Sequence, residues 1–149
     1  CPFCMNEPPQ KQIGRDDFSK IPNGAPGIET RLMLLWDGGV RARRIDMHRF
    51  VEIVASNPAR MFGLWPRKGT IAVGSDGDLV IWDPQKTVTL SAETHHMRVD
   101  YNPYEGRVVQ GAPSMVLSRG DVIVDNGTFT GARGRGQFIK RHGGPPLVA

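Results

Sequence analysis

Two prolines and two glycines fall within six residues, from Pro22 to Gly27, and this stretch restricts the backbone more than any other part of the chain. Each proline fixes its own φ angle, removes a hydrogen-bond donor and disfavours helical angles for the residue before it. Gly24 and Gly27 permit backbone angles and close approaches that a side chain would prevent. The sequence therefore predicts a tightly bent loop that leads into a helix. Such a loop can present backbone groups to a ligand, although composition alone favours an ordinary connecting loop.

The composition is typical of a loop-rich globular protein with one hydrophobic core. Of its 149 residues 39% are hydrophobic, 18 are glycine and 12 are proline, and the net charge is only +4. No apolar run approaches the roughly 20 residues that span a bilayer, and no signal-peptide pattern opens the chain. We therefore expect no membrane partner. The chain begins without a methionine, and we interpret it as a piece of a longer protein.

The two cysteines, Cys1 and Cys4, have CxxC spacing. In a redox enzyme such a pair precedes a helix whose N-terminus lowers a thiol pKa. Here residues 5–9 include two prolines and cannot start a helix in the normal way, and no second cysteine pair or zinc-finger histidine pair follows. The sequence therefore disfavours a redox or zinc role for this pair. Two reduced cysteines without a disulfide framework indicate the cytoplasm.

The residues after the bent loop have the periodicity of a helix. Its apolar face comprises Ile28, Leu32, Leu35 and Trp36. Gly38-Gly39 is predicted to end this helix, as glycine commonly does.

A second helix is predicted to begin at Asp46, which is a good N-cap. Its buried stripe is predicted to comprise Met47, Phe50, Val51 and Val54. His48 lies off this stripe and is expected to be solvated. Asn57 is then predicted to cap a short third helix with Pro58 at its first position, and Gly63 to stop it.

From Gly69 onward the periodicity changes to that of strands. The sequence predicts about six short strands, at residues 70–73, 78–83, 87–90, 107–110, 115–118 and 122–124. Residues 119–121 are predicted to form a turn, and Asp125-Asn126-Gly127 a hairpin turn into Thr128-Phe129. Because one helical unit makes no bundle and the strands leave open edges, both layers need further partners.

Residues 91–106 have no clear period and form a long excursion between strands. Loops of this length are usually functional or clamped onto another part of the molecule. His95 and His96 fall within it, but adjacent side chains point in different directions and spacing places no carboxylate partner beside them, so metal binding is disfavoured. The tail from Gly131 contains only two Arg-Gly repeats without interleaved aromatics, which favours a flexible or subunit-packing tail over a nucleic-acid partner.

The chain resembles the C-terminal third of the dihydropyrimidinase and D-hydantoinase family of cyclic amidohydrolases. The resemblance runs in order over about residues 1–141. The motifs that carry it include Gly14-Arg15-Asp16-Asp17-Phe18, Lys20-Ile21-Pro22-Asn23-Gly24, Pro26-Gly27-Ile28-Glu29-Thr30-Arg31, Asn102-Pro103-Tyr104-Glu105-Gly106 and residues 57–59, 68–71, 74–76 and 78–83.

The resemblance implies a fold class of α/β plus β. Residues 1–64 would be the end of a metal-dependent hydrolase (β/α)₈ barrel of TIM type, comprising a substrate loop and outer helices. Residues 65–130 would be the C-terminal part of a small β-sandwich, and residues 131–149 a C-terminal tail. The family is usually tetrameric, so a homotetramer is expected for the full-length protein.

The resemblance also implies hydrolytic opening of cyclic amides, namely dihydropyrimidines and 5-substituted hydantoins, to N-carbamoyl amino acids. Family members use two metal ions, usually zinc, which activate a water and polarise the amide carbonyl. The metal ligands and the proton-shuttling aspartate precede this stretch in the family, so the chain is predicted to contain no catalytic and no metal-binding residue. Asn23 is the one predicted substrate-binding residue, through its main-chain groups.

Two other functions stay open on the sequence alone. The same fold could serve as a non-catalytic assembly or signalling protein whose metal ligands have been lost, because the discriminating residues are not in this chain. A free-standing redox or nucleic-acid module would depend only on the CxxC pair and on Arg133-Gly134-Arg135-Gly136.

Overall fold

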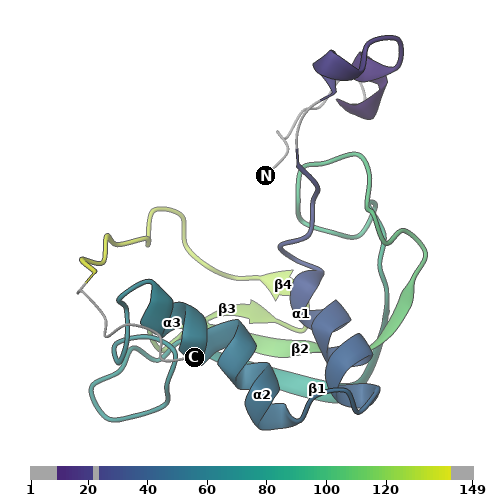
Figure 1. Ribbon diagram of the computed structural model, residues 1–149. Helices are drawn as coiled ribbons and strands as arrows, with labels where there is room; N and C mark the ends of the chain where they lie inside the picture. Colours follow the sequence, from purple (N-terminus) through teal and green to yellow (C-terminus); the bar gives the residue numbers. More distant parts are fainter. Residues whose placement is uncertain (1–9, 22–23, 142–149) are drawn as a thin grey trace.

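The computed structural model describes residues 10–21 and 24–141. Its α-helices form a layer packed on one antiparallel sheet (Figure 1). Two short 3₁₀ helices and three short α-helices precede the sheet, and the α-helices are joined or extended by π-helical turns. The elements in chain order are η1 (Gln10–Gly14), η2 (Phe18–Lys20), α1 (Arg31–Leu35), η3 (Trp36–Arg41), α2 (Met47–Val51), η4 (Glu52–Ser56), α3 (Asn57–Met61), β1 (Leu79–Thr89), β2 (Val108–Ser118), β3 (Asp121–Asp125) and β4 (Thr128–Phe129).

The four strands of the described chain form a meander in the order β1-β2-β3-β4, and each pairs antiparallel with the next. The predicted strands at 78–83 and 87–90 are one strand, β1, because an irregularity between Asp83 and Thr87 bends it without breaking its pairing with β2. The predicted strands at 107–110 and 115–118 are likewise one strand, β2. The expectation of about six strands is therefore corrected to four in the described chain, of which β1 and β2 have 11 residues each.

Residues 70–73 were predicted to form a strand, and this prediction is wrong. The segment is a series of bends, with the Ile71 side chain 86% exposed and Val73 fully exposed. Its alternating apolar pattern requires a neighbouring strand, and the described chain places none beside it. Both turns predicted downstream are confirmed. Arg119-Gly120 and Asn126-Gly127 each have two successive positive φ angles, as the tight turns of twisted hairpins require.

The helix that begins at Arg31 does not end at Gly38-Gly39 as predicted but continues through η3 to Arg41. Gly39 is buried, and a Cβ built there would lie 3.0 Å from Cδ1 of Ile45. This glycine therefore serves the packing of the following segment against the helix. Ile28, predicted to share the apolar face, is 72% exposed because it lies before the first helical turn.

Residues 47–61 form one continuous helical run, and its predicted start is confirmed. The Asp46 carboxylate accepts a hydrogen bond of 2.7 Å from the Arg49 N–H and so caps the first turn. Asn57 was predicted to cap a separate helix, and this is wrong: it has helical angles, and its N–H bonds to the Glu52 carbonyl five residues back. The π turn accommodates Pro58, whose ring and missing N–H do not fit a regular α-helical ladder.

Gly63 ends this helical run, as predicted. It has φ +66°. Its N–H bonds to the Arg60 carbonyl, and the N–H of Leu64 reaches back to the Ala59 carbonyl. These two bonds form a Schellman motif, which satisfies carbonyls at the end of the helix.

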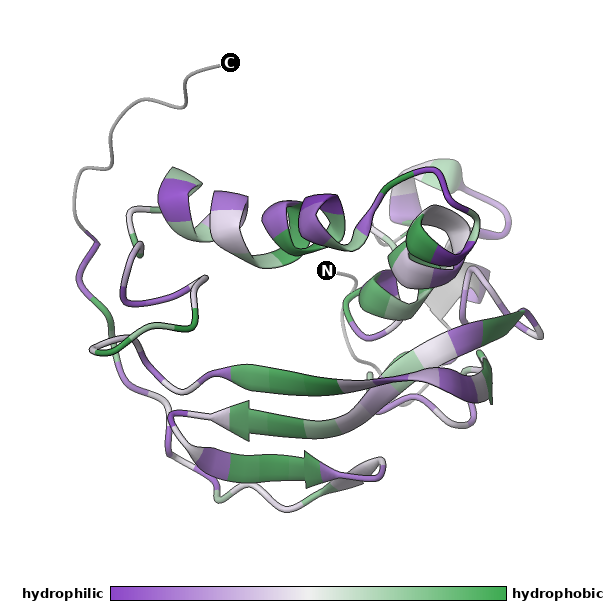
Figure 2. Cartoon of the chain, turned by 90° about the horizontal axis from the view of Figure 1, so that it is seen from below, coloured by the Kyte–Doolittle hydropathy of each residue, from purple (hydrophilic) through white to green (hydrophobic). Residues whose placement is uncertain are grey.

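The helices cover one face of the sheet (Figure 2), and aromatic rings fill the interface. Trp36 lies in an edge-to-face contact with Phe50 of α2 at 5.6 Å between ring centroids, and 5.2 Å from the ring of Trp82 on β1. Asp37 adds a polar link, because its Oδ1 accepts hydrogen bonds from Arg41 Nε at 2.8 Å and from the Gln110 N–H of β2 at 3.3 Å. Helix and sheet are thereby joined by both apolar and charged contacts.

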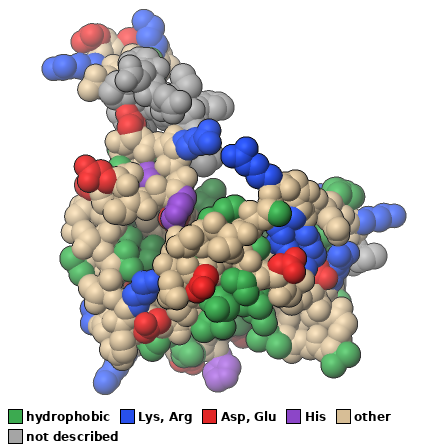
Figure 3. All heavy atoms as spheres, turned by 180° about the vertical axis from the view of Figure 1, so that it is seen from behind, with side chains coloured by type: hydrophobic (Ala, Val, Ile, Leu, Met, Phe, Trp, Pro, Cys, Tyr) green, Lys and Arg blue, Asp and Glu red, His purple; other side chains and the backbone are tan. Residues whose placement is uncertain are grey.

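Several large apolar side chains on the helices and strands are exposed, and Figure 3 shows hydrophobic side chains gathered on one face among charged ones. Within the predicted stripe of α2, Phe50 is buried, whereas Met47 is 56% and Val51 48% exposed. His48 is exposed, as predicted. Among the described helices, none is long and apolar enough to cross a membrane.

Candidate functional site

The bent loop predicted before the first helix is held by its own backbone at the helix start. Gly24 has φ +95°, a region that favours glycine, and Pro26 is fully buried. The Gly27 carbonyl accepts a hydrogen bond of 3.0 Å from the Arg31 N–H, and Thr30, only 2% exposed, makes a longer contact to the same carbonyl. These contacts fix the part of the loop that adjoins α1.

The excursion at residues 91–106 lies against this loop (Figure 1). Glu29 accepts two hydrogen bonds from His96: one from the main-chain N–H at 2.7 Å and one from ring Nδ1 at 2.8 Å. The Tyr101 hydroxyl donates to the Gly24 carbonyl at 3.4 Å. Of the two expectations for this long excursion, a functional loop or one clamped onto another part of the molecule, these hydrogen bonds confirm the second.

Internal hydrogen bonds give the excursion a defined shape. At its base, Leu90 accepts a hydrogen bond from the Gly106 N–H at 2.8 Å and donates to the Arg107 carbonyl at 2.9 Å. Glu105 accepts from the Ala92 N–H at 2.8 Å. Hydrogen bonds from the Ser91 hydroxyl and from the Ala92 N–H lower the pKa of Glu105, so its carboxylate stays charged across the neutral range.

A pocket of about 140 Å³ separates the loop from the base of the excursion. Its lining is mixed, from Glu29, Thr30, Met33, Val88, Thr89, Leu90, Ser91, Thr94, His95 and Asn102. Asn102 Nδ2 and His95 Nδ1 are buried without a hydrogen-bond partner among the described residues. His95 Nε2–H donates a hydrogen bond to the Val99 carbonyl, so in a neutral ring Nδ1 is an acceptor. Two lining residues thus carry an unpaired buried nitrogen, a donor on Asn102 and an acceptor on His95, which suits a small polar occupant.

Asn23, the predicted substrate-binding residue, and Pro22 beside it lie outside the described residues. The structure describes the chain on either side: the Ile21 N–H bonds to the Phe18 carbonyl at 3.1 Å, and Gly24 is bound by Tyr101. Cys1 and Cys4 also lie outside the described residues.

The described residues contain no group of three or more His, Cys, Asp or Glu side chains that could hold a metal ion. The two adjacent histidines are engaged otherwise: His95 Nε2 contacts the Val99 carbonyl at 2.9 Å, and His96 pairs with Glu29. The part of the chain that the structure covers therefore does not fit a two-metal centre.

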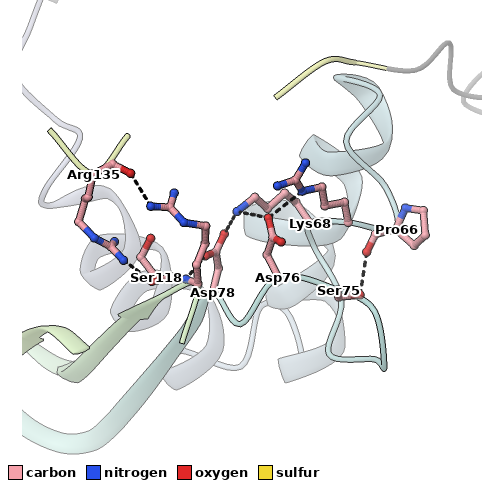
Figure 4. Close-up of polar contacts among 9 residues, drawn as sticks. Pro66, Lys68, Ser75, Asp76, Asp78, Ser118 and Arg135 are labelled. Carbon is pink, nitrogen blue, oxygen red and sulfur yellow. Dashed lines mark hydrogen bonds and ion pairs between the residues drawn. The ribbon is translucent and has the colours of Figure 1, made fainter. Parts of the chain in front are cut away.

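A second polar cluster joins the segment after the helices to the start of the sheet (Figure 4). Lys68 lies between Asp76 and Asp78 and pairs with both, at 2.9 Å from Asp76. Arg67 also pairs with Asp76 at 2.9 Å, and the Arg119 N–H donates to Asp78 at 2.8 Å. This cluster is structural in character, because opposite charges satisfy one another.

The same end of the sheet also holds part of the C-terminal tail (Figure 4). Arg135 donates to the Ser118 carbonyl and to Asp121, both at 2.7 Å, and its own carbonyl accepts a hydrogen bond from Arg119. The guanidinium of this one residue is therefore tied to the turn between β2 and β3, and the flexible or subunit-packing tail stays a prediction.

The sequence profile of the Amidohydrolase family matches residues 16–123 of the chain. The chain belongs to the amidohydrolase family. Among its amidohydrolase relatives, the D-hydantoinase of Geobacillus stearothermophilus is 54% identical over 132 residues, which cover 89% of this chain and 28% of that relative. The dihydropyrimidinase of Rattus norvegicus is 49% identical over 132 residues, which cover 89% of this chain and 25% of the relative.

Solved structures agree with this assignment. The dihydropyrimidinase from Brevibacillus agri NCHU1002 superposes with a TM-score of 0.90 at 50% identity, covering 97% of this chain and 31% of that one. The resemblance to hydantoinases and dihydropyrimidinases is thereby confirmed. This amidohydrolase chain spans less than a third of the length of these relatives.

Sequence reasoning did not identify Glu29, His96 and Tyr101 as contacts of the bent loop. Glu29 and His96 are 67 residues apart in the chain, and Gly24 and Tyr101 are 77 apart, so no local pattern links them. The one available signal was the length of the excursion, which predicted a clamp without naming its residues.

Proposed function

We propose that this chain is part of a metal-dependent hydrolase that opens cyclic amides, namely dihydropyrimidines and 5-substituted hydantoins, to N-carbamoyl amino acids. One observation carries the proposal: about half of the residues are identical to those of a D-hydantoinase and a dihydropyrimidinase over 89% of the chain. A match of this extent covers the loop, the helices and the sheet together. The substrate would be a small cyclic amide, with no nucleic-acid or membrane partner.

In this proposal residues 1–64 are the end of a (β/α)₈ barrel, residues 65–130 a share of a β-sandwich and residues 131–149 a tail. The helical run ends at Met61, and only antiparallel strands follow it in the described chain, which supports a boundary near residue 64. β1 and β4 are open edges of the sheet, which a second share of a sandwich would cover.

Asn23 is the proposed substrate contact in this chain, through its main-chain groups. The loop geometry supports the proposal, because Gly24 needs its positive φ and its carbonyl is held by Tyr101. A main-chain contact requires a backbone that is already fixed before the ring binds.

The two zinc ions of the proposed enzyme would be held by residues outside this chain. The described part does not fit them, and residues such as His95 and His96 have other partners. The isolated 149-residue chain is therefore proposed to be inactive. The full-length protein is proposed to be a cytoplasmic homotetramer.

The test is ring opening by the full-length protein that contains this chain. Hydantoin and dihydrouracil would be supplied separately, loss of the cyclic amide followed spectroscopically, and metal content measured on the same sample. We expect turnover by the full-length protein and none by the 149-residue chain alone. A full-length protein that opens neither ring would reject the hydrolase, and one that also holds no metal would favour the non-catalytic assembly protein.

A further inference from the structure

The Glu29–His96 pair and the Tyr101–Gly24 contact bracket the loop that precedes α1. Gly24 is held at the beginning of the described part of the loop, and Glu29 is held at its end, one residue before the buried Thr30. Both holds come from the same excursion, residues 91–106. The loop and the excursion are thus connected at two points. These points are five residues apart in the loop, at Gly24 and Glu29, and five residues apart in the excursion, at His96 and Tyr101.

The contact between Glu29 and His96 fixes the orientation of the Glu29 carboxylate and the position of the loop along the excursion. The carboxylate can only accept, so the main-chain N–H and the ring Nδ1–H both donate, one to each oxygen. A carboxylate held by two donors cannot rotate without losing one of the bonds. The main-chain donor also ties the loop to the backbone of the excursion, which a side-chain pair alone would not do.

This pair contributes little to global stability. The side chains of His96 and Glu29 are 67% and 32% exposed, and pairs so open to solvent are worth little in unfolding free energy. Loss of the pair would therefore change the position of the loop and not the unfolding free energy of the protein. The effect of the pair on the loop can thus be measured apart from its effect on stability.

We infer that Glu29, His96 and Tyr101 are positioning residues, which hold the main chain from Gly24 to Glu29 in place beside the site that receives the cyclic amide. The inference rests on the proposed function. None of the three touches substrate in this inference. They act through the backbone at Gly24, adjacent to the proposed contact at Asn23, and determine how much of the loop's conformational freedom is lost before the ring binds.

The test uses three substitutions in the full-length protein: Glu29→Ala, His96→Ala and Tyr101→Phe. Each has a matched control that removes the same group from an exposed position elsewhere, namely Glu93→Ala, His48→Ala and Tyr104→Phe. The measurements are KM and kcat for hydantoin opening, metal content and the temperature of unfolding.

We expect KM to rise roughly threefold to tenfold in Glu29→Ala and His96→Ala, as for the loss of one or two partly exposed charged hydrogen bonds. The expected change in kcat is less than about twofold, because the lost contacts support ground state and transition state alike. Tyr101→Phe should show a smaller rise in the same direction. The double variant Glu29→Ala/His96→Ala should be no worse than either single one.

A conservative substitution separates positioning from simple loss of structure. His96→Asn keeps the main-chain donor and places a side-chain amide near the position of Nδ1, so it should recover part of the KM of the wild type. If the wild type is active but Glu29→Ala and Glu93→Ala have the same KM, this inference alone is overturned. An inactive wild type would overturn the proposed function and this inference with it.

Discussion

Gly111 of β2 lies directly against the indole of Trp36, at the contact between the helical layer and the sheet. A Cβ built on Gly111 would lie 2.2 Å from both Cδ1 and Nε1 of Trp36. Gly111 also has φ +99°, where residues with a side chain are strained. The glycine is therefore required twice, by the backbone angle and by the ring above it.

Gly111→Ala is expected to destabilise the full-length protein by about 3 kcal/mol or more. The positive φ accounts for about 1–2 kcal/mol of this cost, and forcing a methyl group into the tryptophan ring accounts for a further 1–3 kcal/mol, roughly. The measurement is urea-induced unfolding. Gly74→Ala is the control, since Gly74 has φ +90° and open space around it; it should show only the backbone part. Equal costs for the two variants would mean that the ring contact is unimportant.

Asp46→Ala is expected to cost about 1 kcal/mol, the usual value of an N-cap. The carboxylate accepts from the Arg49 N–H at 2.7 Å, and this donor is left unpaired in the variant. Asp46→Ser keeps an acceptor at the cap and should retain most of the stability. The comparison is made by urea unfolding at one pH, and an Asp46→Ser variant as unstable as Asp46→Ala would contradict the capping role.

Local chemistry explains which parts of this fold follow from the sequence. The Asp46 cap, the Gly63 helix stop and the Asn126-Gly127 turn depend on a few neighbouring residues, and each is found where the pattern predicts it. In the described part of the bent loop, Gly24 has the positive φ angle that its residue type permits.

Tertiary contacts explain the parts that do not follow. The helix continues through Gly39, although glycine commonly ends a helix. A glycine is needed here because Ile45 packs where a side chain at position 39 would be. A π turn lets the chain pass Pro58 without a new cap. The candidate site could not be predicted from local patterns either. His96, the partner of Glu29, is 67 residues away in the sequence, and only the folded chain brings the two together.

The Lys68 cluster predicts how stability changes with pH. A hydrogen bond from Lys68, then one from Arg67, lowers the pKa of Asp76. Partial burial alone would raise the pKa of Asp78, but hydrogen bonds from Lys68 and from the Arg119 N–H together lower it. Carboxylates with lowered folded pKa values stabilise the fold above their unfolded pKa of about 4, and this contribution is lost as pH falls through the folded values.

Wild-type protein should therefore lose stability between about pH 5 and pH 3, and Lys68→Met should lose less over the same range. Without the ammonium, the two carboxylates repel each other, and protonation relieves that repulsion. The measurement is the urea midpoint at several pH values. Lys140→Met, at an exposed position of the tail, should keep the wild-type slope. Parallel acid curves for wild type and Lys68→Met would show that the cluster is not linked to folding.

The exposed apolar side chains on the outer side of α2 predict that another part of the full-length protein covers this side. Met47 and Val51 are one helical turn apart and are 56% and 48% exposed, although Phe50 on the same turn is buried. An apolar face of this kind in the proposed barrel portion would pack against the remaining chain.

Val51→Ser is expected to cost about 2 kcal/mol in the full-length protein. His48→Ser, on the same helix at an exposed position, should change stability by less than about 0.5 kcal/mol. Since the residues replaced have helix propensities close to that of serine, the difference between the two variants reports burial alone. A Val51→Ser variant as stable as His48→Ser would count against assigning residues 1–64 to a larger barrel.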